Sequence, residues 1–423
     1  MATDFAQVRD RLTEKSVSGN YRSFVMIGGI LAVVGIALFA MALSGDGSHR
    51  AWQTFHVNWL FFTGLTGGSI AITAVHKIAN AKWSGLILRL SQAVSAFIPV
   101  SVIGLVLIFT FGYHDIYGNM QEALHGVSPG KALWLSKGWM ATRLFVGLGV
   151  LYFLGMRLIR SDMLPDLLLA KEQVTGARKA RYERLLRGYD EAENHTRIYR
   201  LAGGFAATYA LVFTLVAFDG IMALQPHWFS NLLGGWFFMG SFLGAHMLLA
   251  LLMIHARKHG VGLEEFISPK QRHDLAKLCF GFTVFWAYLM WAQFLVIWYG
   301  NLPEETGFIF ARLWGPWRVI GSAVFLGMFV LPFTGLLGVG PKKTPIILGF
   351  FATISLCALW LERYLLVMPS VTAEAGPVFG VPELGPTLIF LGLFLVCIGW
   401  FANTFPMVSP RLALITLERE AGH

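Results

Sequence analysis

The chain has 423 residues, of which 56% are hydrophobic and only 13% are charged. Soluble domains carry about 25% charged residues, so this composition excludes a soluble enzyme, a disordered chain and a nucleic-acid-binding module. The formal net charge of +9 does not favour nucleic acid as a partner, because the basic residues lie between the apolar stretches. The composition therefore indicates a polytopic membrane protein.

A helix needs about twenty predominantly apolar residues to cross the hydrocarbon core of a bilayer. In chain order, such stretches cover residues 23–43, 52–76, 83–111, 138–158, 200–220, 229–254, 275–299, 318–339, 345–367 and 385–405. Strands of a membrane barrel need only about ten alternating residues, so these lengths favour helices. The sequence thus predicts an all-α chain with ten transmembrane helices in one membrane domain, 23–405, between tails at 1–22 and 406–423.

The distribution of Lys and Arg predicts the orientation, because cytoplasmic segments carry the excess of these residues. Of the 33 basic residues, 25 lie in the two tails and the even-numbered loops, 6 lie on the other side, and Arg89 and Arg143 lie within spans. Both termini are therefore expected in the cytoplasm, beside anionic lipid headgroups. The segment 159–199 is predicted to be a cytoplasmic insertion with a surface helix at Lys171–Arg187.

A short repeat links the second and sixth spans, where WLFFTG at Trp59–Gly64 resembles GWFFMG at Gly235–Gly240. These spans run in the same direction, so a duplication would produce two parallel four-helix bundles. Chance is the alternative, since aromatic residues and glycine are common in membrane spans.

Ionisable side chains inside a membrane are costly and usually face a bundle interior or a water-filled cavity. His56, Arg143 and Asp219 lie near the outer ends of the second, fourth and fifth spans. Oxidation of a quinol needs a group that accepts its protons and a cation that holds the resulting anion. These three residues are therefore candidates for a quinol site or an outer proton site. Alternatively, Arg143 and Asp219 form a buried ion pair that ties two helices together.

A second group of ionisable residues is distributed through the depth of the membrane and could transfer protons. Its members are His246, Asp274, Arg89, His76 and Glu362. The sequence places His246 near the middle of its span, and imidazole suits proton transfer because its pKa is near neutrality. The alternative for His246 is a core histidine that is hydrogen-bonded across helices.

No spacing of ligands in the spans predicts a bound metal. The three cysteines are far apart in apolar stretches and provide neither a zinc site nor an iron–sulfur cluster. A bis-histidine haem needs two histidines at matched depths, whereas His56, His76 and His246 lie at three different depths. We therefore expect no haem and no iron–sulfur cluster bound by this chain.

Three segments carry a family resemblance. The first is Phe218–Ser230 (FDGIMALQPHWFS), the second runs from His273 to Thr306 and ends in IWYGNLPEET, and the third is Leu361–Pro369. The first resembles the DW-x-M-S-L-E-P-H-W-[FY]-S motif of the NrfD-like membrane subunits of alternative complex III, and the second resembles a block of the ActF-type subunit. The chain departs from the first motif at three positions, which are Gly220, Ala223 and Gln225.

This resemblance implies an integral subunit of a respiratory quinol:electron-acceptor oxidoreductase in the bacterial inner membrane, inactive as an isolated chain. Its substrate would be a menaquinol or ubiquinol. Its partners would be a paralogous NrfD-like membrane subunit, a periplasmic iron–sulfur subunit and multihaem cytochrome c subunits. The family fold implies two four-helix bundles, spans 2–5 and 6–9, flanked by spans 1 and 10.

The outer loops are rich in aromatic residues and poor in charge, which favours docking of a peripheral subunit. The expected docking residues are Pro226, His227, Trp228, Asn301, Pro303 and Glu304. Two other functions stay open: a non-catalytic scaffold or proton-conducting subunit of the same complex, and an independent secondary transporter. Pro99 and Pro332 disfavour the transporter, because they interrupt spans that do not correspond in a repeat of four plus four helices.

Overall fold

The computed structural model describes residues 5–124, 127–258, 261–372 and 376–421, which form helices and, within those ranges, no strand. Within these ranges, ten helical segments are long and apolar enough to cross a membrane, which confirms the predicted number. In chain order they are α2 (Arg22–Leu43), α3 (Ser48–Ile78), the third span from α4 (Leu88–Gln92) through α5 (Ile98–Leu107) to α6 (Tyr113–Ala123), α8 (Lys137–Ala170), α10 (Glu191–Gly220), α11 (Leu233–Lys258), α12 (Pro269–Gly300), the eighth span from α14 (Arg318–Phe325) to α15 (Leu331–Gly335), α17 (Pro345–Val371) and α18 (Val381–Thr404).

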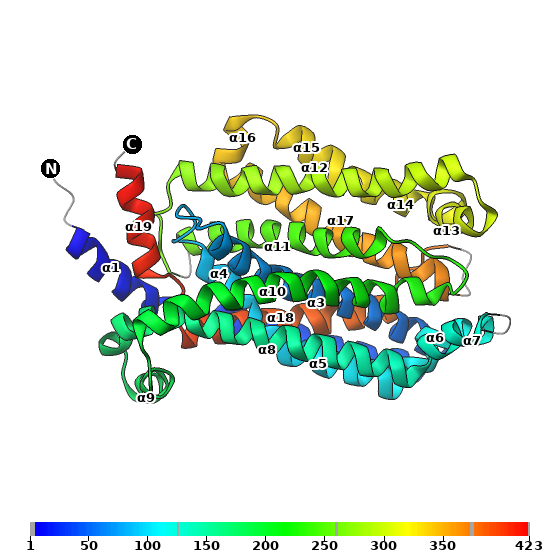
Figure 1. The fold of residues 1–423 in the computed structure, drawn as a ribbon, viewed down its shortest axis with the longest axis horizontal. Coiled ribbons are helices and arrows are strands. Elements are labelled where there is room, and N and C mark those ends of the chain that lie inside the picture. Colours follow the sequence, from blue (N-terminus) through cyan, green and yellow to red (C-terminus); the bar gives the residue numbers. More distant parts are fainter. Residues whose placement is uncertain (1–4, 125–126, 259–260, 373–375, 422–423) are drawn as a thin grey trace.

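The long helices lie side by side, and short helices cover the two ends of the molecule (Figure 1). One end carries α1 (Phe5–Ser18), α9 (Gly176–Leu185) and α19 (Pro410–Ala421), and we call it the termini end. The opposite end carries α6, α7 (Pro129–Trp134) and α13 (Pro303–Leu313), and we call it the loop end.

The third and eighth spans are irregular, as their prolines predict. Pro99 stands in the first turn of α5, directly after a 3₁₀ segment, and the same span contains a π-helical turn at Ile108–Gly112. The eighth span has a π-helical turn at Leu326–Val330, with Pro332 in the first turn of the helix that follows. Proline lacks the N–H that a continuous helix needs, so both spans are assembled from shorter pieces.

The predicted insertion 159–199 is shorter in the structure, because α8 continues to Ala170 and α10 begins at Glu191. The expected surface helix is reduced to α9, preceded by a single 3₁₀ turn at Lys171–Gln173. The two tails are not free chain either. Leu12 of α1 is fully buried, and the Met407 N–H donates to the Ser16 carbonyl at 3.0 Å.

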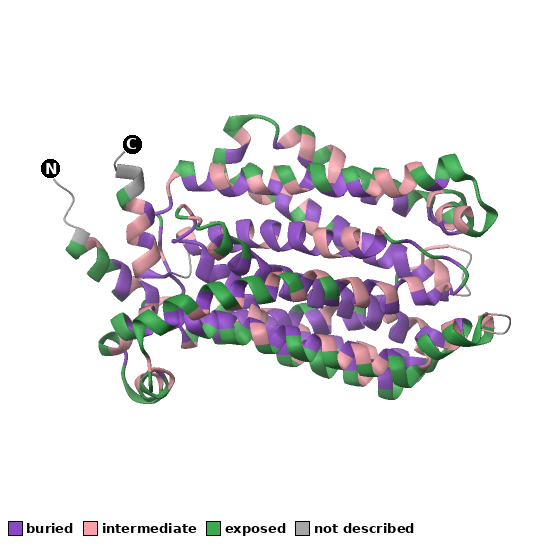
Figure 2. Cartoon of the chain, viewed as in Figure 1, coloured by how far each residue is buried: buried purple, intermediate pink, exposed green. Residues whose placement is uncertain are grey.

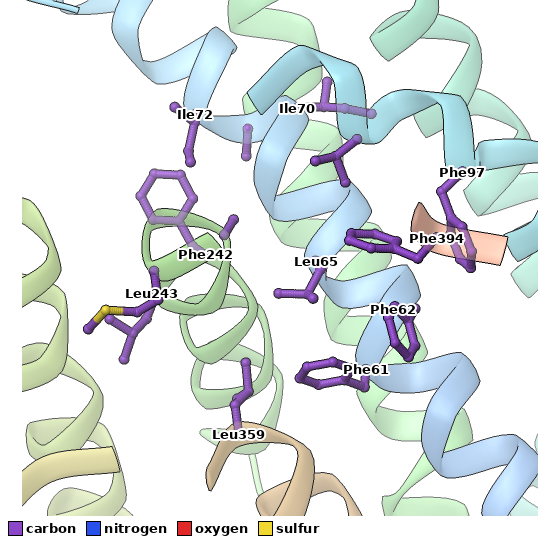
Figure 3. Close-up of a cluster of buried hydrophobic side chains, with 14 of the residues drawn as sticks. Phe61, Phe62, Leu65, Ile70, Ile72, Phe97, Phe242, Leu243, Leu359 and Phe394 are labelled. Carbon is purple, nitrogen blue, oxygen red and sulfur yellow. The ribbon is translucent and has the colours of Figure 1, made fainter. Parts of the chain in front are cut away.

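The helix α3 is the centre of the fold. In its most apolar stretch, 94% of the residues are buried, against 17% for the first span, so α3 is enclosed by protein whereas α2 faces outward. Figure 2 shows the buried residues concentrated on the inner helices. α3 packs against α10, α11, α17 and α18. Phe61, Phe62 and Leu65 of α3 form part of a hydrophobic cluster with side chains from α11 and α18 (Figure 3).

The first and last spans pack closely, because small residues line their interface. A Cβ atom at Gly28 would lie 2.6 Å from the Gly392 carbonyl oxygen, and one at Gly35 would lie 2.8 Å from the Gly385 carbonyl oxygen. Contacts at this distance leave no room for a side chain. Small residues are the usual means of close helix approach in a bilayer, where the hydrophobic effect does not drive helices together.

Replacing Gly35 with Leu is expected to destabilise the protein by about 1–3 kcal/mol, the usual cost of overpacking a tight interface. Gly29→Leu is the matched control, because nothing lies within 4 Å of a Cβ atom at that position. The measurement is the midpoint of thermal unfolding in detergent, which should fall only for Gly35→Leu. Equal midpoints for the two variants would contradict the close approach of α2 and α18.

Candidate functional site

An apolar cavity of about 520 Å³ lies towards the loop end, between α11, α12, α13, α14 and α17. Its wall is mostly aromatic and aliphatic. Three lining side chains, Trp291, Phe325 and Leu326, are also exposed, so the cavity opens at the surface formed by α12 and the eighth span. An apolar cavity with a few convergent polar groups is the usual form of a small-molecule site.

Glu362 of α17 is the acidic group of this cavity. It is 1% exposed, and among the described lining residues it is the only acid. Trp286 Nε1 donates to its Oε1 at 2.8 Å, and Arg363 Nη1 donates to its Oε2 at 2.6 Å. The Arg363 guanidinium also lies over the Phe237 ring, 4.1 Å from its centroid. A buried carboxylate with both oxygens hydrogen-bonded is held in one orientation.

Arg312 of α13 provides a buried cation in the same wall. Its guanidinium lies 3.3 Å from the centroid of the Phe308 ring and donates to the Leu366 carbonyl at 2.7 Å and to Ser370 Oγ at 2.6 Å. Within the described part of the chain it makes no ion pair, and its Nε has no acceptor. Burial without a counter-charge lowers the pKa of Arg312 well below its ordinary value. The group is therefore suited to an anionic or strongly polar ligand atom.

Two tryptophan N–H groups add further donors. Trp228 stacks on Phe308 with ring centroids 3.7 Å apart and planes 6° apart. The Nε1 atoms of Trp228 and Trp236 are buried and have no acceptor among the residues that the structure describes. Both rings line the cavity. A ligand with carbonyl or hydroxyl oxygens would satisfy these donors, which are costly to leave unpaired.

The structure brings the three predicted outer residues together. Arg143 Nε donates to Asp219 Oδ2 at 2.6 Å, and His56 Nε2 donates to the carbonyl of the adjacent Gly220 at 2.8 Å. Tyr117 OH donates to the Asp219 carbonyl at 3.1 Å. None of His56, Arg143 and Asp219 lines the cavity described above. Their geometry matches the alternative reading of a buried ion pair, which here fixes the end of α10.

Arg89 belongs to a buried charged cluster that the sequence does not predict. Its guanidinium contacts Asp166 and lies 3.7 Å from Asp162, and both carboxylates are on α8. Lys77 Nζ lies 2.5 Å from Asp162, and Ser409 Oγ donates to Asp166 at 2.9 Å. In the sequence, both aspartates fall within the predicted cytoplasmic insertion 159–199. Their spacing of four residues was a usable signal, since it puts both on one helix face.

The other predicted proton-transfer residues have separate surroundings. His76 Nδ1 donates to the Ile72 carbonyl at 2.7 Å, and this side chain lines a cavity of about 190 Å³ at the termini end. His246 Nδ1 donates to the Phe242 carbonyl at 2.9 Å, and its ring packs against Phe282. Asp274 pairs with Lys277 at 2.7 Å near the start of α12, and both side chains are partly exposed.

The six predicted docking residues divide into two groups. His227, Asn301, Pro303 and Glu304 are exposed at the loop end. Pro226 and Trp228 are buried, so the side chain of Trp228 faces the cavity instead of a partner. Trp228 was expected to contact a docked subunit. In the structure its ring is instead buried by stacking on Phe308.

No protein-family model matches the chain, and no curated protein matches it. Among the described residues, no group of three or more His, Cys, Asp or Glu side chains is arranged to hold a metal ion.

Proposed function

We propose that this chain is a membrane subunit of a respiratory quinol oxidoreductase and that the cavity beside Glu362 binds the quinol. The observation that carries the proposal is one apolar cavity that is open at the surface and contains a buried carboxylate and a buried guanidinium. A quinol has an apolar tail, which matches the aromatic wall, and two hydroxyl groups, which match the polar side chains.

The proposed chemistry requires proton and electron acceptors. Oxidation of a quinol to a quinone releases two electrons and two protons. Glu362 accepts the two protons in turn at a carboxylate oxygen and passes the first to water before it takes the second, while Arg312 and the N–H groups of Trp228 and Trp236 hold the substrate oxygens. The electrons pass to an iron–sulfur partner docked at the loop end, where His227, Asn301 and Glu304 are exposed. In this arrangement the Arg143–Asp219 pair positions the end of α10, which precedes Trp228.

In the proposed assembly, the chain spans the inner membrane of a bacterium together with other subunits. Both termini lie in the cytoplasm of a bacterium, so the cavity lies in the outer part of its inner membrane. Spans 2–5 and 6–9 form two four-helix bundles, with spans 1 and 10 beside them, next to a paralogous membrane subunit. Multihaem cytochrome c subunits accept the electrons after the iron–sulfur partner.

The direct test is quenching of tryptophan fluorescence by a short-chain ubiquinone analogue added to the full chain in detergent. Four tryptophans line the cavity, which are Trp228, Trp236, Trp286 and Trp291. We expect saturable quenching, and we expect Ser322→Phe to weaken the apparent affinity by roughly tenfold by filling the entrance. The matched control is Ala323→Phe, because Ala323 does not line the cavity. Quenching that is linear in quinone, or equal in both variants, would refute the site.

Polar side chains of α3 and α11 support a second role for the chain, which is proton transfer. Ser69, Thr73 and His76 of α3 each have a buried polar atom without a partner among the described residues. His246 lies on α11, which packs against α3. Farther towards the loop end, Arg363 Nη2 donates to Ser241 Oγ at 3.3 Å and Arg363 also binds Glu362. This row leads from the His76 cavity towards the proposed quinol site.

In an assembled complex, His246→Phe is expected to preserve quinol oxidation and to impair the coupled proton translocation. Imidazole can accept and donate in turn, whereas phenylalanine fills the space without exchanging protons. The measurement is proton release and membrane potential in vesicles that contain the complex. Unchanged translocation in a fully assembled His246→Phe complex would leave His246 as a core residue.

A further inference from the structure

A second cavity, about 210 Å³, lies at the termini end, between the ends of α8 and α10 and the turn that follows α9. It is unrelated to the proposed quinol site. Four arginines line it, namely Arg157, Arg160, Arg187 and Arg197. Tyr189 and Asn194 add polar side chains to its wall.

The cavity has an excess of positive charge. Its two acidic residues are already engaged, because Asp190 Oδ1 caps α10 by accepting from the Glu193 N–H at 2.7 Å and Glu193 pairs with Arg197. Arg160 Nη2 donates to the Leu185 carbonyl at 3.3 Å. Neither Arg160 nor Arg187 has an ion-pair partner in the described ranges. These guanidinium groups therefore remain available to an anion.

A buried acceptor gives the cavity a second recognition feature. Asn194 is 3% exposed, and its Nδ2 donates to the Ser161 carbonyl at 2.9 Å. That bond fixes the orientation of the amide, and its Oδ1 is buried with no donor among the described residues. An acceptor of this kind is satisfied by a hydroxyl group, which a simple anion such as chloride does not have.

The position of the cavity relates it to the bilayer. Phe153 and Met156 of α8 are 56% and 51% exposed, as lipid-facing residues of a span would be. Arg157 and Arg160 follow within about one helical turn, so the cavity lies where the apolar surface ends. Basic pockets at the cytoplasmic edge of membrane helices are suited to anionic lipid headgroups.

We propose that this cavity binds the phosphate group of an anionic glycerophospholipid. The guanidinium groups of Arg160 and Arg187 donate to the phosphate oxygens, a pairing in which both partners are charged. Asn194 Oδ1 accepts a hydrogen bond from a headgroup hydroxyl, such as that of phosphatidylglycerol. The acyl chains run along the exposed face of α8 beside Phe153 and Met156. Free phosphate shares the first interaction but has no apolar chains.

The test is native mass spectrometry of the full chain in detergent, titrated in separate samples with phosphatidylglycerol, phosphatidylcholine and inorganic phosphate. We expect one tightly bound phosphatidylglycerol, weakened by roughly thirty-fold in the double variant Arg160→Gln/Arg187→Gln. The matched control is Arg184→Gln/Arg200→Gln, which removes the same charge from two exposed arginines outside the cavity. Circular dichroism should show equal helix content in all three proteins.

The outcomes distinguish a lipid site from an effect of general surface charge and from a site for free phosphate. Loss of phosphatidylglycerol in the cavity variant alone supports the site, and so does partial retention in Arg160→Lys/Arg187→Lys, which keeps the charge. Equal loss in the control variant overturns the site, because the effect is then one of general surface charge. Binding of phosphatidylcholine as tight as that of phosphatidylglycerol also overturns it. Binding of inorganic phosphate without phosphatidylglycerol overturns the assignment to a lipid.

Discussion

Replacing Glu362 with Gln is expected to lower the rate of quinol oxidation by the assembled complex by roughly 10²–10⁴-fold, the usual contribution of a positioned proton acceptor. Glutamine retains the size of the side chain and can still accept from Trp286 Nε1, but its amide cannot take the proton of the substrate. The measurement is the steady-state reduction of an electron acceptor by a short-chain quinol in membranes that contain the complex.

Glu383→Gln is the matched control for this experiment. Glu383 is also a buried acid with an arginine partner, since Arg50 Nη2 donates to its two oxygens at 2.8 Å each. It does not line the cavity, so its loss weakens a helix contact without removing a proton acceptor. Quinone quenching of the isolated chain separates binding from turnover. Normal turnover in Glu362→Gln would assign the proton to another group.

The sequence predicted the ten spans because apolar length is a strong signal in a bilayer. It predicts the helix ends less well, because a charged residue after an apolar stretch also indicates the start of a loop. Asp162 and Asp166 illustrate the error: α8 continues through both residues because Lys77, Arg89 and Ser409 satisfy their carboxylates. Those partners come from α3, α4 and the C-terminal segment. They are distant in the sequence, so the hydropathy of residues 138–170 alone cannot predict that the helix continues.

The candidate site was only partly predictable for a related reason. Glu362 was recognised as an ionisable residue inside a span, but nothing local to it indicates a cavity. The cavity forms because residues of α11, α12, α13, α14 and α17 meet around it. Arg312 is one of the six basic residues on the side opposite the termini, and nothing near it in the sequence predicts that it is buried. Its burial depends on the packing of α13 against α17, where it binds the Leu366 carbonyl.

The charged cluster around Arg89 leads to the second large expected effect. Arg89→Met is expected to destabilise the protein by about 3–5 kcal/mol, because removing one partner leaves buried charge uncompensated. Asp166 is the more affected acid, since Asp162 retains Lys77 at 2.5 Å and Gln92 Nε2 at 2.7 Å. The measurement is the thermal midpoint, together with the yield of monodisperse protein in detergent.

A second substitution separates lost charge compensation from lost packing. Arg89→Met/Asp166→Leu removes both members of the buried pair, and replacing such a pair with apolar residues of similar size is often close to neutral. The double variant should therefore regain most of the stability that Arg89→Met loses. Arg184→Met, at an exposed position of α9, should leave the midpoint unchanged. A double variant as unstable as Arg89→Met would show instead that the guanidinium acts mainly through its contacts with Gln92 and the Asp162 carbonyl.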